Sequence, residues 1–380
     1  MKLFLSSLLM LLSATAIAQD QPPKAVDAAT KAAALYGLID YSAQHVSNTD
    51  AGTGKSLTGS SFDAIVPSHF GLRLSLPLAN GYVLGSLLEK AVSAPLTQSS
   101  TTLYRVFNRA AYVSLGHQTW GRVDLGYAPN LINALQTVPL GGLSVNLATI
   151  VSANITEFYT PDSLTYTSPN MDGFSARFQY GAAGSDTAYG TGVTTKNGPI
   201  VMAVADYQTP TYGFSLAAQQ RDAGDGPGLS PNLRNAYEKS SYIMAVRYTA
   251  GRLKLGASLL RNSYAPADTP LNGQPAATIN AYQMGFSYAL RADLVAGASY
   301  TANSMDSSNL NIQARYAFNK ATTFYVQVNH VNNSNPASRD SKAIGNFFSV
   351  NAPDLYPDVK RLGLNNGAAT AFGVGAIYRF

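Results

Sequence analysis

The segment Asn309-Leu-Asn-Ile-Gln-Ala-Arg-Tyr-Ala-Phe318 alternates between apolar even positions and mostly polar odd positions. Successive side chains of a β-strand point to opposite faces of a sheet, so an alternation with period two predicts a strand with one apolar face. The same alternation recurs at 173–182 and at 240–250. These segments predict an all-β chain whose strands are apolar on one side only.

Runs of this kind predict sixteen strands. They lie near 35–46, 68–77, 82–93, 107–117, 122–129, 161–169, 173–182, 199–208, 213–222, 240–250, 253–263, 278–290, 293–304, 308–318, 322–333 and 370–380. Most have the roughly 9–11 residues that a tilted strand needs to cross a bilayer. The length and the alternation together predict strands that span a membrane.

The connections between these strands differ in length. Short turns lie at 78–81, 170–173, 251–252, 291–292 and 319–321, whereas long polar segments lie at 47–67, 130–160, 183–198, 223–239, 264–277 and 334–369. Short turns at one end and long loops at the other are typical of an outer-membrane barrel, and an even strand number closes it without exposed edges. We therefore predict a 16-stranded antiparallel transmembrane β-barrel. A soluble β-sandwich or propeller is the alternative, but it would hide its apolar face in a shared core.

The N-terminus has the pattern of a secretory signal. Lys2 precedes an apolar run at 3–12, which is followed by small residues ending in Ala16-Ile17-Ala18. This order predicts a signal peptide at 1–18, and the apolar run is shorter than the ~20 residues of a spanning helix. A buried N-terminal helix is the alternative. We expect an N-terminal tail at 19–34 and the barrel at 35–380.

The composition argues against several functional classes. The chain has no cysteine, which excludes disulfides, thiol nucleophiles and thiolate metal sites. Only 12% of residues are charged, about half of the usual share, and the net charge of +5 is scattered rather than clustered as in nucleic-acid binding proteins. The histidines lack metal-ligand spacing and no nucleophile elbow is present; they are His45, His69, His117 and His330. We expect no enzyme activity, no catalytic residue, no cofactor and no metal.

The last strand supports a membrane location independently. Its alternate residues Phe372, Val374, Ala376, Tyr378 and Phe380 share one face, and the sequence stops at that aromatic residue. A terminal phenylalanine exposed to water has no physical reason to persist on a soluble protein.

Five motifs in order resemble one family. They are Leu35-Tyr36-Gly37-Leu38-Ile39-Asp40, Ser68-His69-Phe70-Gly71-Leu72-Arg73, 107–116, 163–174 and Tyr378-Arg379-Phe380. The chain resembles the Gram-negative general porins of the β-proteobacterial type, a trimeric sixteen-stranded group. The resemblance implies an outer-membrane homotrimer that passes ions and small hydrophilic solutes by diffusion. It also implies contact with outer-membrane lipid and lipopolysaccharide, and a C-terminal signal at Tyr378 and Phe380 for the barrel assembly machinery.

The resemblance further implies a pore constriction at which the third loop, 130–160, folds into the barrel. Arg73, Arg109 and Glu89 match charged positions of the family, whereas His69 and Tyr159 stand where many members have arginine. The candidate constriction residues are Arg73, Arg109, Glu89, His69, Arg122, Asp124, Tyr159 and Glu157.

Alternation places most of these charges toward the lumen. Arg73, Glu89, Arg122 and Asp124 alternate with apolar neighbours, and the same phase applies to Arg177, Arg247, Lys254 and Arg315. Arg109 is the exception, because strict alternation from Val113 turns it toward lipid. An arginine in hydrocarbon costs ~2–4 kcal/mol at the midplane. A bulge or a position at the strand end is therefore expected at Arg109.

The third loop departs from the family pattern. Glu157 is its only acid, and much of the loop is apolar: Leu131, Ile132, Leu135, Val138, Leu140, Leu143, Val145, Leu147, Ile150 and Val151. Such a loop could pack against the wall and narrow the pore, or favour less polar solutes. With few acids opposite the arginines, the field is expected to be weak and mildly positive. We predict a general diffusion pore, with a substrate-specific channel and a surface adhesin or structural barrel as alternatives.

Overall fold

The computed structural model describes residues 32–47, 56–62, 64–92, 107–143, 159–182, 184–187, 194–222, 237–265, 277–304, 307–333 and 367–380. The predicted signal peptide at 1–18, the tail as far as residue 31, and Glu157 lie outside these residues. β1 begins at Ala32, slightly before the predicted start of the barrel at residue 35.

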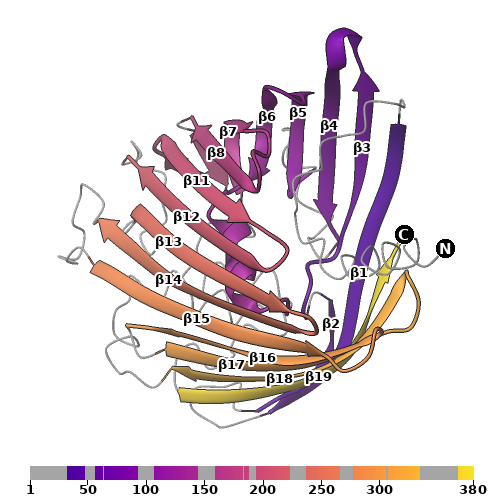
Figure 1. Ribbon diagram of the computed structural model, residues 1–380. Coiled ribbons are helices and arrows are strands. Elements are labelled where there is room, and N and C mark those ends of the chain that lie inside the picture. Colours follow the sequence, from indigo (N-terminus) through magenta and orange to yellow (C-terminus); the bar gives the residue numbers. More distant parts are fainter. Residues whose placement is uncertain are drawn as a thin grey trace.

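The strands follow one another along the chain with very little helix between them (Figure 1). They are β1 (Ala32–Val46), β2 (Leu57–Phe62), β3 (His69–Pro77), β4 (Tyr82–Ala91), β5 (Ala110–His117), β6 (Gly121–Pro129), β7 (Tyr159–Thr167), β8 (Phe174–Gly181), β9 (Gly184–Thr187), β10 (Thr194–Asn197), β11 (Ile200–Gln208), β12 (Tyr212–Arg221), β13 (Tyr237–Ala250), β14 (Leu253–Ala265), β15 (Ala277–Ala289), β16 (Leu294–Asn303), β17 (Ser307–Ala317), β18 (Thr322–Asn333) and β19 (Gly367–Arg379). Every predicted strand is present, and the bounds differ by only a few residues.

The sheet closes between its first and last strands. β1 pairs with β19 in an antiparallel register that sets Leu38 opposite Arg379. Gly37 and Phe380 exchange two backbone hydrogen bonds, from Gly37 N to Phe380 O at 3.0 Å and from Phe380 N to Gly37 O at 3.1 Å. The C-terminal residue therefore completes the barrel, and closure removes the edges at which such a sheet would aggregate.

β2 and β3 lie end to end along β1. Residues 32–38 of β1 pair with β3, and residues 41–46 pair with β2. The seventeen strands of the main sheet therefore occupy sixteen positions around the barrel. β2 corrects the prediction that 47–67 is wholly loop. Likewise, 183–198 contains the paired strands β9 and β10.

The barrel reverses the polarity of a soluble protein. Outward-facing Val113, Leu115 and Leu125 are 52%, 45% and 59% exposed, whereas lumen-facing Asn311 and Gln313 are 0% and 1% exposed. A soluble surface would not carry so many exposed large apolar side chains, but a lipid-facing wall requires them. Among the described residues, no helix is long and apolar enough to cross a bilayer.

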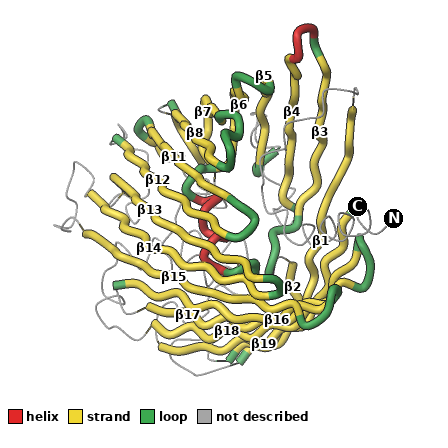
Figure 2. Tube along the Cα trace, viewed as in Figure 1, coloured by secondary structure: helices red, strands yellow, loops and turns green. Residues whose placement is uncertain are grey.

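Two short 3-10 helices are present among the described residues (Figure 2). η1 (Ala79–Gly81) forms the turn between β3 and β4. η2 (Asn133–Leu140) follows β6 and lies inside the ring of strands. The fold therefore places one helical segment in the path of any solute that crosses the barrel.

Candidate functional site

The inward segment 130–143 packs its apolar side chains against the barrel wall. Leu131, Ile132 and Leu135 are at most 6% exposed and belong to one cluster with wall residues. The wall contributes Ile200, Met202, Val204, Ala217, Ile243, Ala245, Leu260 and Ala281 from β11 to β15. The lumen-facing side of these strands is therefore apolar where the segment covers it. Of the two interpretations left open by the sequence, the described part of the loop adopts the first, contact with the wall.

Two glycines make room for η2. Gly256 on β14 and Gly285 on β15 are direct cross-strand partners. A Cβ at Gly256 would overlap the carbonyl oxygen of Val138, and a Cβ at Gly285 would lie 2.8 Å from the backbone of Leu140. Glycine is used where two backbones approach this closely. We call this pair the glycine notch.

Polar contacts hold both ends of the segment. Asn130 donates its side-chain amide to Gln219 Oε1 at 3.2 Å. At the other end, Ser287 Oγ donates to Gly141 O at 2.5 Å, and Arg315 donates to Gly142 O at 2.6 Å. The described segment 130–143 is thus held at both of its ends and along its apolar face.

A chain of charged and aromatic side chains lies on the wall formed by β1, β3, β4 and β5. Tyr36 donates its hydroxyl to Glu89, and Arg109 Nε lies 3.5 Å from Glu89 Oε2. The guanidinium carbon of Arg73 lies 5.0 Å from the centre of the Tyr36 ring. That of Arg109 lies 5.9 Å from the centre of the Tyr159 ring. The structure therefore brings together four of the predicted residues: Arg73, Glu89, Arg109 and Tyr159. Tyr36 lies between Arg73 and Glu89 and contacts both.

The position of Arg109 resolves the expected conflict with alternation. β5 begins at Ala110, so Arg109 precedes the strand and does not follow its phase. Its side chain pairs with Glu89 and is only 8% exposed. Of the two possibilities, a bulge or a strand end, the structure shows the strand end.

The other candidate residues that the structure describes, His69, Arg122 and Asp124, lie near this row of side chains. His69 donates through Nδ1 to Pro67 O at 2.8 Å and meets Tyr36 edge to face, at 6.2 Å between ring centres. Arg122 and Asp124 form a two-point ion pair, with Nε to Oδ1 and Nη2 to Oδ2 distances of 2.8 and 2.9 Å. His69 is therefore part of the wall, and the ion pair largely cancels its own charge.

Sequence reasoning missed three features of the lumen. Tyr36 links Arg73 to Glu89, and only its inward phase could have suggested this. Arg247, Lys254 and Arg315 gather near the loop tip, where Lys254 lies beside Gly142. Their inward orientation could be predicted from the alternation of the sequence. That the third loop would lie beside them could not.

The third missed feature is a second inward segment, 64–68, which covers Asp40. The Asp40 carboxylate is fully buried and accepts from Ile65 N at 2.7 Å, Val66 N at 2.9 Å and the Tyr325 hydroxyl at 2.5 Å. Ile65 is fully buried against Leu38, Tyr325 and Ile377. We call this arrangement the Asp40 lock.

The described residues offer no site for a metal: no group of three or more histidine, aspartate or glutamate side chains is close enough to hold an ion. The charged side chains of the lumen lie instead along a wall on which water and ions are the possible contacts.

Comparisons with known proteins agree with this arrangement. The family model for Gram-negative porins matches residues 6–336. The anion-selective porin from Comamonas acidovorans is similar in structure, with a TM-score of 0.70 and 19% identity over 92% of this chain and 100% of that chain. A loop-deletion mutant of OmpT from Vibrio cholerae has a TM-score of 0.61 and 12% identity over 92% and 99% of the two chains. OmpF from Salmonella typhi, in complex with daunomycin, has a TM-score of 0.58 and 14% identity over 92% and 100%.

At these identities the solved structures show a shared fold alone, and no curated protein matches the chain. The family model, in contrast, extends over most of the sequence. A closed barrel with an apolar exterior, a polar interior and an inward loop has the form that passive diffusion across an outer membrane requires. The chain belongs to the Gram-negative porin family and forms an outer-membrane channel for passive diffusion.

Proposed function

We propose that the channel is a general diffusion pore with a weak preference for anions. The observation that carries the proposal is an excess of basic side chains over available acids in the lumen. Glu89 pairs with Arg109, Asp124 with Arg122, and Asp206 with Arg177 at 2.8 Å. The fourth described lumen acid, Asp40, is fully buried, and its carboxylate already accepts three hydrogen bonds in the Asp40 lock.

Several basic side chains have no such partner. Among the described residues, no acid forms an ion pair with Arg73, Arg247 or Lys254. Arg247 donates to the neutral amide of Gln208 at 3.0 Å. Side-chain charge on a pore rim selects ions of opposite sign, so this excess favours anions. The similar porin from Comamonas acidovorans is described as anion-selective, which agrees with the proposal.

A substrate-specific channel is the second candidate. The apolar composition of the third loop is the feature that suggested it. In the described part of that loop, Leu131, Ile132 and Leu135 are buried against the wall, and Leu140 and Leu143 are buried against each other at 0% and 1% exposure. Side chains buried in this way offer no surface to a passing solute. This observation favours the general pore.

Neutralising Lys254 should reduce the anion preference. We expect Lys254→Gln to lower the chloride-to-potassium permeability ratio about two- to threefold, since a unit charge ~7 Å away in water contributes about 0.6 kcal/mol. Reversal potentials of single channels in a salt gradient measure this ratio. Liposome swelling should depend on the size of the added sugar alone.

Arg261→Gln is the matched control, because Arg261 lies on the same strand as Lys254 but on the outer face. It should leave the ratio unchanged. A parent channel that already prefers cations, or saturable uptake of one sugar, would contradict the proposal.

We further propose that the channel is a homotrimer assembled through the outer face of β3 to β6. Outward residues of β8 to β19 include aromatic side chains near the strand ends, such as Phe174, Tyr180, Tyr212, Tyr248, Tyr288, Tyr316 and Tyr378. Such girdles mark the contact with the lipid interface. The outer face of β3 to β6 is instead rich in aliphatic residues, including Leu74, Leu84, Val113, Leu115, Val123 and Leu125. OmpT of Vibrio cholerae, a similar structure, is described in a trimer form.

A bulky residue on this aliphatic face should prevent assembly. We expect Val113→Trp to yield monomers, since a large side chain does not fit a packed interface, whereas Val326→Trp on β18 should leave the trimer intact because lipid accommodates it. Mass photometry in detergent measures the oligomer. Trimers of both variants would show that the interface lies elsewhere.

A further inference from the structure

The lumen carries its charged side chains unevenly along the pore axis. Short turns mark the periplasmic end of the strands and long loops mark the extracellular end. Several strands place an inward-facing basic residue close to their periplasmic end. These residues are Arg122 on β6, Arg177 on β8, Arg247 on β13, Lys254 on β14, Arg315 on β17 and Arg379 on β19. We call this set the inner ring.

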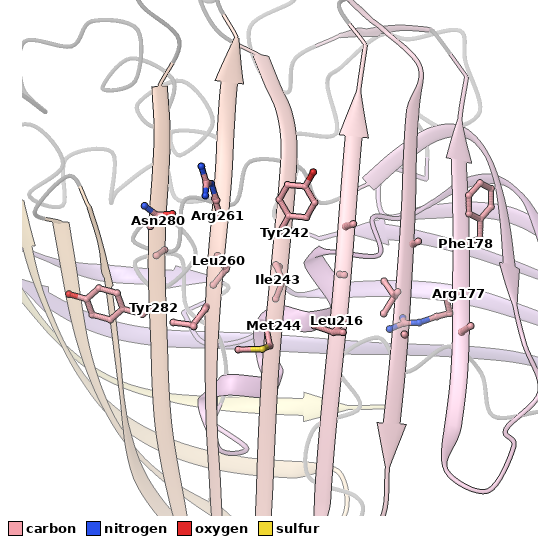
Figure 3. A pocket seen from close by; sticks show the side chains of 18 of the residues that line it. Arg177, Phe178, Leu216, Tyr242, Ile243, Met244, Leu260, Arg261, Asn280 and Tyr282 are labelled. Carbon is pink, nitrogen blue, oxygen red and sulfur yellow. The ribbon is translucent and has the colours of Figure 1, made fainter.

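The extracellular half of the lumen wall is close to neutral among the described residues. Its inward positions carry amides and a hydroxyl, at Gln219, Ser241, Asn262, Asn303, Asn309 and Asn329. Arg221, at the end of β12, is the exception, and Arg109 is paired with Glu89. Figure 3 shows the wall of β8 and β11 to β15, where Arg177 lies nearer the short turns than Arg261, an outward-facing residue.

The inner ring has a net positive charge although two of its members have acidic partners on the wall. Among the described residues, no acid forms an ion pair with Arg247, Lys254 or Arg379. Lys254 lies within electrostatic range of both Arg247 and Arg315, and Arg315 lies within range of Arg379. Asp40 is also within range of Arg379, but its carboxylate already accepts the three hydrogen bonds of the Asp40 lock.

The composition of the connections adds to this asymmetry. In the six long segments named above, acids slightly outnumber bases. The short turns, in contrast, carry Arg252, Arg291 and Lys320 against Asp172 and Asp293. The channel is therefore more positive at its periplasmic end than at its extracellular end.

We propose that the inner ring is the anion filter of this channel and makes it rectify the ionic current at low ionic strength. The inference rests on the proposed anion preference and deepens it. It places the selecting charges at the periplasmic mouth, away from the wall of β1 to β5 that carries Arg73.

Rectification follows from the position of the filter. When the outer side is positive, anions enter through the inner ring from the periplasmic side, and cations arriving from the outer side are held back at the ring. Both ions then accumulate in the lumen, and the current rises. With the opposite polarity both ions are depleted, and the current falls. A filter in the middle of the pore would treat the two polarities alike.

The effect should depend on salt. The Debye length is ~30 Å at 0.01 M and ~3 Å at 1 M ionic strength, whereas the apolar band of such a barrel is ~25 Å tall. The field of the ring therefore extends along the whole pore only in dilute salt. We expect the current with the outer side positive to be about 1.5 to 2 times that at the opposite voltage near 10 mM KCl, and the two to be equal near 1 M.

Single channels of known orientation in planar bilayers can test the proposal. Because the chain has no cysteine, Lys320→Cys introduces a single thiol in a periplasmic turn. Biotin attached there, with streptavidin added to one chamber, identifies the periplasmic side of each channel. The two polarities can then be compared directly.

A rescue variant separates the position of a charge from its presence. Lys254→Gln should lower both the rectification and the chloride-to-potassium permeability ratio. Adding Gln44→Lys, at an inward position in the extracellular half of β1, should restore the permeability ratio but not the rectification. Arg261→Gln on the outer face of β14 is the matched control and should leave both quantities unchanged.

Three results would overturn the inference while leaving the anion preference intact. The first is equal current for the two polarities in the oriented parent near 10 mM KCl, with chloride still preferred. The second is a larger current when the outer side is negative. The third is loss of rectification in Arg73→Gln but not in Lys254→Gln, which would place the filter on the other wall. A cation preference in the reversal potentials would instead contradict the proposed function on which the inference rests.

Discussion

Replacing Gly256 by valine is expected to displace η2 from the barrel wall and to raise the single-channel conductance. The glycine notch exists because the backbone of residues 138–140 lies directly on β14 and β15. A valine side chain at Gly256 would occupy the space of the Val138 carbonyl and of Pro139. Overpacking of this kind costs ~1–3 kcal/mol, which is comparable to the contacts that hold the segment in place.

The segment rather than the strand should move. β14 is paired along its whole length with β13 and β15, whereas residues 141 and 142 of the inward segment accept side-chain hydrogen bonds from Ser287 and Arg315. Displacement would uncover the apolar wall and widen the lumen. We expect conductance in planar bilayers to rise by roughly half or more, since pore width limits the flow of hydrated ions.

Gly116→Val is the matched control. Gly116 also faces the lumen, but a Cβ there would come no closer than 3.7 Å to the flexible side chain of Arg122. Its conductance should stay near the parent value. A normal conductance for both Gly256→Val and Gly285→Val would mean that the notch does not position the constriction.

The sequence was sufficient to predict the barrel because the relevant signals are local. Period-two alternation depends only on neighbouring residues. The pattern seen at Asn309–Phe318 recurs in the other predicted strands. Loop length is equally local. The inward phase of Arg73 and Glu89 followed from the same alternation, and the structure places both on the lumen side.

The position of the inward segment was harder to predict because its contacts join distant parts of the sequence. Gly256 and Gly285 are ordinary strand glycines until the segment 138–140 is placed against them. The hydrogen bond from Tyr36 to Glu89 joins β1 to β4. Similarly, β2 was hidden within a segment whose composition is typical of a loop, and only its pairing with β1 makes it a strand.

Replacing Asp40 by alanine is expected to destabilise the barrel by about 3–5 kcal/mol, since three buried donors would lose their acceptor. Those donors are the amides of Ile65 and Val66 and the hydroxyl of Tyr325. Tyr325 reaches Asp40 across β19, at Gly375, where a Cβ would overlap the tyrosine ring. The lock therefore joins β18, β19 and β1 at the seam where the barrel closes.

A series of variants separates the lock from a general effect of losing a charge. Asp40→Asn keeps one carbonyl oxygen for the two amides and should lie between the parent and Asp40→Ala, and Tyr325→Phe should cost about 1–2 kcal/mol. Asp293→Ala is the control, because its ion pair with Arg291 is exposed in a turn and should not affect stability measurably. Guanidinium titrations in lipid vesicles, followed by circular dichroism, measure these differences. Equal stability of Asp40→Ala and the parent would show that segment 64–68 is held by the apolar packing of Ile65 alone, and that the buried carboxylate contributes no net stability to the seam.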